Sequence, residues 1–421
     1  MNKREFLQII TSMGLTTAFW QDLAAFDTNQ EYQTLSRLSN DEEKFWKHIR
    51  SLYELKPDYI NLENGWYNII PKPILKAYFE EIHKLNLEGT YYMRTRLFDD
   101  NIEVRKQLAQ LVGCSYEELI ITRNTTESID TVIAGIDWKP GDEVIFNTQE
   151  YPAMIDMFKV QARRYGIVNK IISIPNDPKS DEEIVSLYEK AITPKTRVIL
   201  VSHIINITGH ILPVRKICDM ARNRGIFTIV DGAHAVAHFD FKISDLNCDA
   251  YASSLHKWLS VPLGAGMLYL RKDRIKEIWC LFGETAYPDE DIRKLNHIGT
   301  HPAHTVLTIP ASIEFYQKIG AKRKENRLRY VQEYWTSKVR GVPNIFLNTP
   351  SQSHRACGIA NVGIQHIKPA NLAKILLEKY KIWTVAIDHP EVQGVRITPN
   401  IFTTTDELDK LVAALIELSK K

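Results

Sequence analysis

Two residues in the middle of the chain have the types and the spacing needed for chemistry on an amine. Asp231 follows the apolar segment 227–230, and Lys257, twenty-six residues later, follows a second apolar segment, 250–253. Each alone is ordinary, because an aspartate before glycine is usually a turn residue and a lysine is usually solvated. Together, a Schiff-base lysine and a carboxylate that pairs with a pyridinium nitrogen are what pyridoxal phosphate requires. The sequence therefore predicts pyridoxal 5'-phosphate as cofactor, with Lys257 and Asp231 as catalytic residues.

A phosphate group needs its own binding site, and one junction between a strand and a helix fits it. Asn124, followed three residues later by Glu127, has the pattern of a capping box at the start of an expected helix, 125–136. The first turn of such a helix offers free backbone N–H groups and the positive end of the helix dipole. The expected phosphate ligands come from this turn and from the lysine segment: Thr125, Thr126, Ser254 and His256.

The elements that must position these residues can be read from the alternation of apolar patterns. Expected strands are 119–121, 143–146, 168–174, 198–203, 227–230, 250–253 and 266–270. Expected helices between them are 101–112, 125–136, 153–165, 181–191 and 214–224. Strands alternating with helices of this length predict a largely parallel sheet covered on both faces. Ligands of such sheets bind beyond the carboxyl ends of the strands, where Asp231, Lys257 and Asn124 all fall.

The pattern of apolar and charged residues changes after about residue 305. A long charged helical stretch, 313–335, leads into short strands and helices, including expected strands at 358–365, 383–387 and 394–397. Residues 1–60 are polar and helix-like, with an expected helix over 41–55. We therefore predict an N-terminal arm (1–60), a large α/β domain (61–305) and a small α+β domain (306–421).

Composition excludes several classes of protein. The net charge is +2, from 53 basic and 51 acidic residues, which gives no electrostatic reason to expect a nucleic-acid partner. The five cysteines are scattered and form no C-x-x-C pair, so they indicate neither a disulfide framework nor a zinc site. No apolar run approaches the roughly 20 residues needed to span a bilayer, so we expect no stable membrane insertion.

The N-terminus allows two interpretations. Lys3 and Arg4, followed by a short apolar stretch, resemble a twin-arginine export leader over residues 1–25, with lysine in place of the first arginine. The apolar stretch is interrupted by polar residues, and no A-x-A-like cleavage site follows, which favours an amphipathic helix. We therefore expect a cytoplasmic protein, with a periplasmic location through this leader as the alternative.

Taken together, these motifs resemble the class V aminotransferase family of fold-type I pyridoxal-phosphate enzymes, especially its isopenicillin N epimerase-like and cysteine desulfurase-like members. The resemblance runs from about Asn61 to the C-terminus and is strongest over 198–272. It passes through the motifs Asn206–Gly209, Asp231–His234 and Ser254–Lys257. It implies an α/β fold: a large domain with a mostly parallel seven-stranded sheet, and a smaller α+β domain at the C-terminus.

The resemblance also implies further roles around the cofactor. Asn206 matches an asparagine that hydrogen-bonds the ring oxygen of the cofactor. Tyr151 falls where the family places an aromatic ring or a histidine stacked on the cofactor. His234 stands where desulfurases usually have glutamine, and we count it among the catalytic and cofactor-binding candidates.

Two further matches concern the substrate and the second subunit. Arg396 matches the arginine that clamps the substrate carboxylate, a bidentate task suited to guanidinium. Gly299 and Thr300 match a pair that reaches the phosphate of the other subunit, which implies a homodimer. Thr300 is therefore a cofactor-binding candidate that acts across an interface.

Three features bear on competing readings of the site. Residues 383–394 contain no cysteine where desulfurases carry their nucleophile, and Cys357 is better explained as a buried thiol, which argues against desulfurase activity. His297, His301 and His304 lack the glutamate of the zincin pattern, so we expect no metal. The cluster 91–94 (Tyr-Tyr-Met-Arg) either lines the substrate pocket or packs internally.

The reaction itself is open among several chemistries. Transamination of an amino acid or related small amine needs one base, which Lys257 supplies, and we favour it by a small margin. Epimerisation or racemisation needs a second proton donor, for which Tyr151 and His234 are the candidates. A C–S or β-elimination lyase is the third reading. The non-enzymatic alternative is a cofactor-binding regulator.

Overall fold

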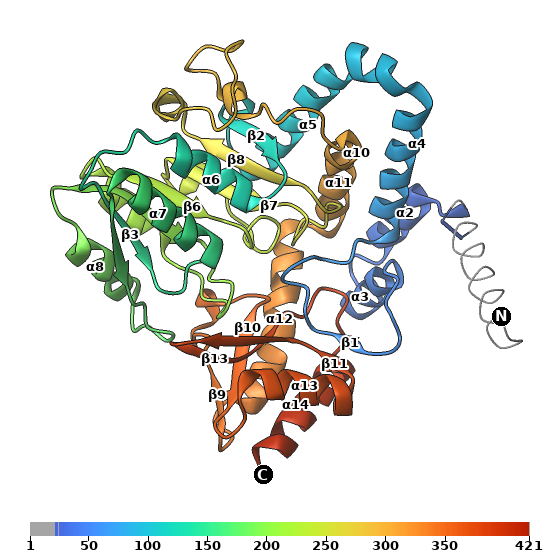
Figure 1. The fold of residues 1–421 in the computed structure, drawn as a ribbon. Coiled ribbons are helices and arrows are strands. Elements are labelled where there is room, and N and C mark those ends of the chain that lie inside the picture. The colour runs from blue at the N-terminus through green and yellow to red at the C-terminus, as the bar shows by residue number, and fades with distance from the viewer. Residues whose placement is uncertain (1–21, 24, 421) are drawn as a thin grey trace, which may run out of the picture.

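The computed structural model describes residues 22, 23 and 25–420, and its centre is a seven-stranded sheet (Figure 1). The strand order is β2-β8-β7-β6-β5-β3-β4. The bounds are β2 Leu119–Thr122, β3 Glu143–Asn147, β4 Val168–Ile172, β5 Thr196–Ser202, β6 Phe227–Asp231, β7 Ala250–Ser254 and β8 Gly266–Leu270. All neighbouring pairs are parallel except those of β8, which runs antiparallel to β2 and β7. The predicted mostly parallel seven-stranded sheet is confirmed.

Helices cover both faces of this sheet because its strands are apolar on both sides. Along β3, Val144 and Phe146 belong to one core cluster, whereas Ile145 between them belongs to the other. The helices on the first face are α6 Thr125–Gly135 and α7 Pro152–Tyr165. Those on the second face are α5 Leu97–Val112, α8 Asp181–Ala191, α9 Val214–Arg222 and α11 Ile309–Ile319.

The C-terminal part is built on a four-stranded antiparallel sheet in the order β12-β13-β10-β9. Its strands are β9 Ile345–Leu347, β10 Ala360–Ile364, β12 Val385–His389 and β13 Val392–Ile397. Helices α13 Pro369–Tyr380 and α14 Thr405–Ser419 pack against it, and α12 Ala321–Val339 runs between the two sheets (Figure 1). This is the smaller α+β unit that the sequence predicts.

Two boundaries in this part differ from the prediction. The expected continuous helix over 313–335 is broken at Gly320, whose φ of +91° ends α11 before α12 begins. A short helix, α10 Ala303–Leu307, precedes both. The expected strand 383–387 is two strands, because β11 Ile382–Trp383 leaves the antiparallel sheet and pairs with β1 Ile60–Asn61.

Near the start of the described chain, α2 Thr28–Arg37 and α3 Glu42–Ser51 contribute to a core cluster shared with distant segments. The predicted helix over 41–55 is shorter at its end, while Asp41 caps its start by accepting a hydrogen bond from the Lys44 N–H (3.1 Å). The predicted leader at 1–25 falls outside the described residues, apart from residues 22, 23 and 25. No helix in the described ranges is long and apolar enough to cross a membrane. The cytoplasmic location and its periplasmic alternative remain predictions.

A long helical hairpin projects from the body of the molecule at the upper right of Figure 1. It consists of α4 Lys72–Thr95, which kinks at Gly89 (φ +53°), and α5. The sequence patterns did not predict α4. Its outer end exposes apolar side chains: Leu87, Tyr91, Met93 and Phe98. Short 3-10 helices elsewhere are Tyr116–Glu118, Ile243–Asp245, Lys272–Glu277, Ile292–Leu295 and Ser353–Arg355.

Candidate active site

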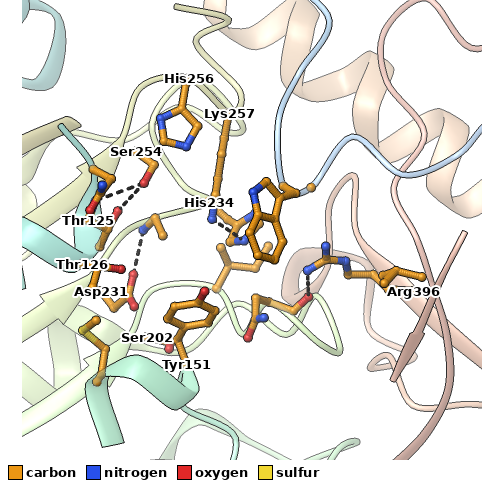
Figure 2. Close-up of a pocket in the computed structure, with 18 of the residues that line it drawn as sticks. Thr125, Thr126, Tyr151, Ser202, Asp231, His234, Ser254, His256, Lys257 and Arg396 are labelled. Carbon is orange, nitrogen blue, oxygen red and sulfur yellow. Dashed lines mark hydrogen bonds between the residues drawn. The ribbon is translucent and has the colours of Figure 1, made fainter. Parts of the chain in front are cut away.

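A cavity of about 440 Å³ lies beyond the carboxyl ends of the central strands and extends to β13. This volume falls within the range of small-molecule sites. The predicted site residues that line it are Thr125, Thr126, Tyr151, Asn206, Asp231, His234, Ser254, His256, Lys257 and Arg396 (Figure 2). Residues separated by up to 271 positions in sequence therefore meet in one pocket. Thr300 is exposed and does not line it, so its role across an interface remains a prediction.

One end of the pocket is formed by the start of α6 and the end of β7. The Thr125 N–H donates to Ser254 Oγ (3.1 Å), and the two hydroxyls lie 2.7 Å apart. Asn124 Oδ1 accepts from the Glu127 N–H (2.9 Å), which is the first half of the predicted capping box. The second half is different, because Glu127 accepts from the N–H of Arg123 (2.6 Å), one residue earlier than expected. The result is a polar helix start whose remaining N–H groups suit an anion.

His256 lies beside this polar end. Its Nδ1 lies 3.1 Å from the carbonyl oxygen of Ala265, which can only accept, so Nδ1 carries a proton. Burial and the nearby Lys257 lower the pKa of His256 to about 4. In the neutral ring Nε2 is then an acceptor, so donation from Nε2 to a phosphate requires the doubly protonated ring. A phosphate dianion at this place would itself favour that form.

Asp231 ends β6 and is 5% exposed. Its Oδ1 accepts from the Ala233 N–H (2.9 Å). Burial raises the pKa of Asp231, while the Ala233 hydrogen bond and the charge of Lys257 oppose the rise. A carboxylate with so few partners can accept a hydrogen bond from a ligand in the pocket.

A second carboxyl group, Glu150, is buried close to Asp231, and the sequence analysis did not identify it. Glu150 Oε1 accepts from the Ser202 N–H (3.0 Å), and its carboxyl also contacts the Ser202 hydroxyl and the Asn147 amide. Burial raises the pKa of Glu150 to about 8, and the charge of Asp231 adds to the rise. The only signal in the sequence is its position directly before Tyr151.

Lys257 follows β7 and is surrounded by buried groups. Burial lowers the pKa of Lys257 to about 8, against the opposing effect of Asp231. Its Nζ lies 2.9 Å from His234 Nε2. Burial, followed by the charge of Lys257, lowers the pKa of His234 well below its ordinary value. The indole N–H of Trp258, which the sequence analysis also missed, donates to His234 Nδ1 (3.4 Å).

Arg396, from β13, forms the opposite wall and is paired with a residue that the sequence did not indicate. Its Nη2 and Nε donate to the two carboxylate oxygens of Glu63, at 2.6 and 3.2 Å. The two side chains are 7% and 8% exposed. The remaining nitrogen, Nη1, donates to the Asn206 carbonyl oxygen (3.2 Å).

Glu63 is held firmly in this pairing. Its Oε1 also accepts from the backbone N–H groups of Gly65 and Trp66, each at 3.1 Å. A side chain at Gly65 would lie 3.1 Å from the guanidinium carbon of Arg396, so glycine lets the turn approach the arginine. Glu63 is therefore a built-in counterion of Arg396.

Tyr151 stands just before α7 and is 36% exposed. Figure 2 shows its hydroxyl directed into the pocket from one side, whereas Lys257 extends into the pocket from the other. Cys357 is buried, and burial raises the pKa of its thiol to about 12, as expected of a core cysteine. Across the described ranges, no three His, Cys, Asp or Glu side chains are grouped so as to hold a metal ion.

Comparison with known proteins places the chain in a family. The family model described as Aminotransferase class-V matches residues 69–399. Isopenicillin N epimerase of Streptomyces clavuligerus is 28% identical over 391 residues, covering 89% of this chain and 98% of that protein. A probable cysteine desulfurase of Methanothermobacter thermautotrophicus is 25% identical over 399 residues, covering 88% and 97%.

Solved structures share the fold. The apo structure of cysteine desulfurase from Thermococcus onnurineus NA1 superposes with a TM-score of 0.79 at 22% identity, covering 89% of this chain and 98% of that one. The cystine C-S lyase C-DES, in complex with its product cysteine persulfide, gives a TM-score of 0.76 at 22% identity, covering 86% and 97%. The sequence relatives are named as epimerases and desulfurases, which correspond to the alternatives of the sequence analysis more than to transamination. The chain belongs to the class V aminotransferase family of fold-type I pyridoxal-phosphate enzymes.

Proposed function

We propose that this protein is a pyridoxal-phosphate-dependent epimerase or racemase that removes the Cα proton of an amino acid or related small amine on one face and adds a different proton to Cα on the other face. The observation that carries this proposal is the approach of Lys257 and Tyr151 to the pocket from opposite sides (Figure 2). The sequence favoured transamination only because no second proton donor could be assigned a position. The similarity to isopenicillin N epimerase supports the same choice.

The chemistry of the donor set fits the cofactor. The N-terminus of α6, with the hydroxyls of Thr125 and Ser254, suits the phosphate. The buried carboxylate of Asp231 suits a protonated ring nitrogen, and Lys257 supplies the amine that binds the aldehyde. When bound, the cofactor withdraws the electrons left on the substrate when a bond at Cα breaks.

The protein's own groups then divide the remaining tasks. Lys257, with its lowered pKa, takes the Cα proton as general base once the substrate amine has displaced it. The Tyr151 hydroxyl donates a proton to Cα from the opposite side. Asp231 keeps the ring nitrogen protonated, and Arg396 orients a polar group of the substrate.

Transamination remains a second candidate because it needs only Lys257. A desulfurase or other C–S lyase is supported by the names of several relatives. Against it, the segment between β11 and β13 contains no cysteine, and Cys357 is buried with a raised pKa. A cofactor-binding regulator would bind amines without turnover.

The reaction is tested by incubating the holoenzyme with a panel of L- and D-amino acids in deuterated water without a keto acid. We expect catalytic loss of optical rotation with deuterium at Cα. Tyr151→Phe is expected to abolish racemisation while Cα exchange with retention continues through Lys257. Stoichiometric keto acid and conversion of the cofactor to its amine form would instead indicate transamination, and sulfide or pyruvate would indicate a lyase.

The cofactor's attachment is tested separately. Borohydride reduction of the holoenzyme followed by peptide mapping is expected to label Lys257. Lys324 provides an internal comparison, because it is a buried lysine outside the pocket and burial lowers its pKa to about 7. A label on Lys324 or any other lysine would overturn the assignment.

We further propose that the protein is a homodimer. The α4–α5 hairpin exposes four apolar side chains at its outer end: Leu87, Tyr91, Met93 and Phe98. A group of exposed apolar side chains of this kind marks a protein–protein contact surface. Trp66 and Leu263, on the pocket wall, are 72% and 58% exposed. A second subunit would cover such surfaces and bring its own Thr300 to the pocket.

A further inference from the structure

A continuous series of side-chain contacts starts at Lys257 and leads away from the pocket into the core. Lys257 Nζ lies 2.9 Å from His234 Nε2, and His234 Nδ1 accepts from the indole N–H of Trp258 (3.4 Å). Trp258 stacks on His238, with ring centroids 3.8 Å apart and planes inclined by 19°. His238 in turn accepts from the Gly358 N–H at Nε2 (2.7 Å). The side chains of Trp258, His234 and His238 are all buried.

The direction of each hydrogen bond follows from elementary proton counting. The indole nitrogen of Trp258 is a donor only, so His234 Nδ1 must carry a lone pair. A neutral imidazole has one proton, which is then on Nε2. Nε2 therefore donates, and Lys257 Nζ, at 2.9 Å, must offer a lone pair. An ammonium group at Lys257 would place two donors face to face.

We infer that Trp258 is a positioning residue: its indole N–H fixes His234 in the tautomer protonated on Nε2, which selects the neutral amine of Lys257. The consequence for function rests on the proposed function. A neutral Lys257 amine can attack the cofactor aldehyde, forming the C–N bond with loss of water, and can later accept the Cα proton. The tautomer itself is a property of the apoprotein.

The surroundings hold Trp258 in place. His238 Nδ1 lies 2.8 Å from the His234 carbonyl oxygen, which can only accept, so His238 carries its proton on Nδ1 and accepts at Nε2. Its ring is thereby fixed against the indole. A side chain at Gly358 would lie 3.0 Å from both His238 and Trp258, so glycine leaves room for the stack.

The surroundings of Lys257 and His234 affect the pKa values of these two residues in both directions. Asp231 and Glu63 favour the protonated form of Lys257, whereas burial and Arg396 oppose it. Burial is the main reason that the charged form of His234 is disfavoured, and the charges of Lys257 and Arg396 add to it. The net effect lowers the pKa of both Lys257 and His234, which agrees with a neutral amine beside a neutral ring.

The test uses the apoprotein with ¹⁵N-labelled histidine and solid-state ¹⁵N spectra, with His234 assigned by difference against His234→Asn. In the wild type we expect His234 to be protonated on Nε2 only. In Trp258→Phe, which keeps an aromatic ring but lacks the donor, we expect the Nδ1-protonated tautomer to appear. The matched control is Trp335→Phe, because Trp335 is also fully buried but its indole N–H has no hydrogen-bond partner within the described residues.

A second readout is the reactivity of Lys257, measured by competitive amine labelling against pH and peptide mass spectrometry. We expect a midpoint near pH 8 in the wild type and in Trp335→Phe, and a rise of at least one pH unit in Trp258→Phe. If Trp258→Phe does not fold, benzothienylalanine at position 258 keeps the indole shape without the N–H. An unchanged His234 tautomer and an unchanged Lys257 midpoint would overturn the inference. Both are measured without cofactor or substrate, so they fail or succeed independently of the proposed reaction.

Discussion

Replacing Glu63 with glutamine tests how the pocket treats a negatively charged substrate. Glu63 occupies the Nε/Nη2 edge of Arg396 and is anchored by two backbone N–H groups, so we expect it to stay in place when a substrate binds. An incoming carboxylate can use only the other edge of the guanidinium, next to a carboxylate already in place. Glu63→Gln removes this charge and keeps the shape of the side chain.

The size of the effect follows from the geometry of a shared guanidinium. Two carboxylates on adjacent edges of one guanidinium lie about 6 Å apart, and their repulsion at an effective dielectric of about 20 is about 3 kcal/mol. Removing it should tighten the binding of an amino acid by roughly 10- to 100-fold, after allowance for solvent screening. Binding of the corresponding amino-acid amide, which carries no carboxylate, should change little.

The assay titrates the holoenzyme's cofactor absorbance with an amino acid and with its α-amide, in the wild type and in Glu63→Gln. Asp181→Asn is the matched control, because it removes a carboxylate from the buried Arg355 outside the pocket. Glu63→Gln should also lower stability to urea, because breaking a buried pair typically costs about 3–5 kcal/mol. Equal or weaker binding of the amino acid by a folded Glu63→Gln variant would refute the reasoning.

Three further predictions concern the cofactor end, the buried carboxyl pair and the assembly. The Asp231→Asn variant should retain part of its cofactor affinity through the phosphate site. Its turnover should fall by roughly 100-fold or more, because the amide no longer favours a protonated ring nitrogen. Turnover equal to the wild type would contradict this role. Burial raises the pKa of Glu150 to about 8 in the folded protein, above its value in the unfolded chain. The contribution of Glu150 to the free energy of unfolding is therefore complete below the unfolded pKa and is lost as pH rises through 8. Urea unfolding of the apoprotein should therefore show Glu150→Gln gaining stability relative to the wild type between pH 5 and pH 8, and parallel curves would exclude the raised pKa. Sedimentation should give a dimer, and Thr300→Ala should weaken cofactor binding; a fully active monomer at assay concentration would contradict both.

The sequence predicted those features that local patterns determine. The strands of the central sheet, the carboxyl-end positions of Asp231 and Lys257, and the polar start of α6 all depend on residues within a few positions of one another. The family resemblance then extended this local pattern to Tyr151 and Arg396, both of which line the pocket.

The features that the sequence did not predict depend on contacts between distant segments. In the local sequence, Glu63 cannot be distinguished from a surface glutamate, because its partner Arg396 comes from β13. Trp258 likewise cannot be distinguished from an ordinary core residue, because its contacts with His234 and His238 arise only in the fold. The break at Gly320 was missed because the charged periodicity continues on both sides of it. No local rule identifies such residues, because their roles are set by a partner that lies elsewhere in the sequence.

The pairing of Glu63 with Arg396 has a consequence for the order in which the chain can acquire its site during synthesis. The two residues are 333 positions apart, and β1 next to Glu63 pairs with β11, close to the C-terminus. Domains fold during synthesis from the N-terminus onward. A nascent chain that already contains the central sheet and Lys257 still lacks β11 and Arg396, because both come later in the sequence. The start of α6 and Lys257 are therefore synthesised well before Arg396, and a chain terminated in that interval would contain the polar helix start and the lysine without the guanidinium that we propose binds the substrate carboxylate.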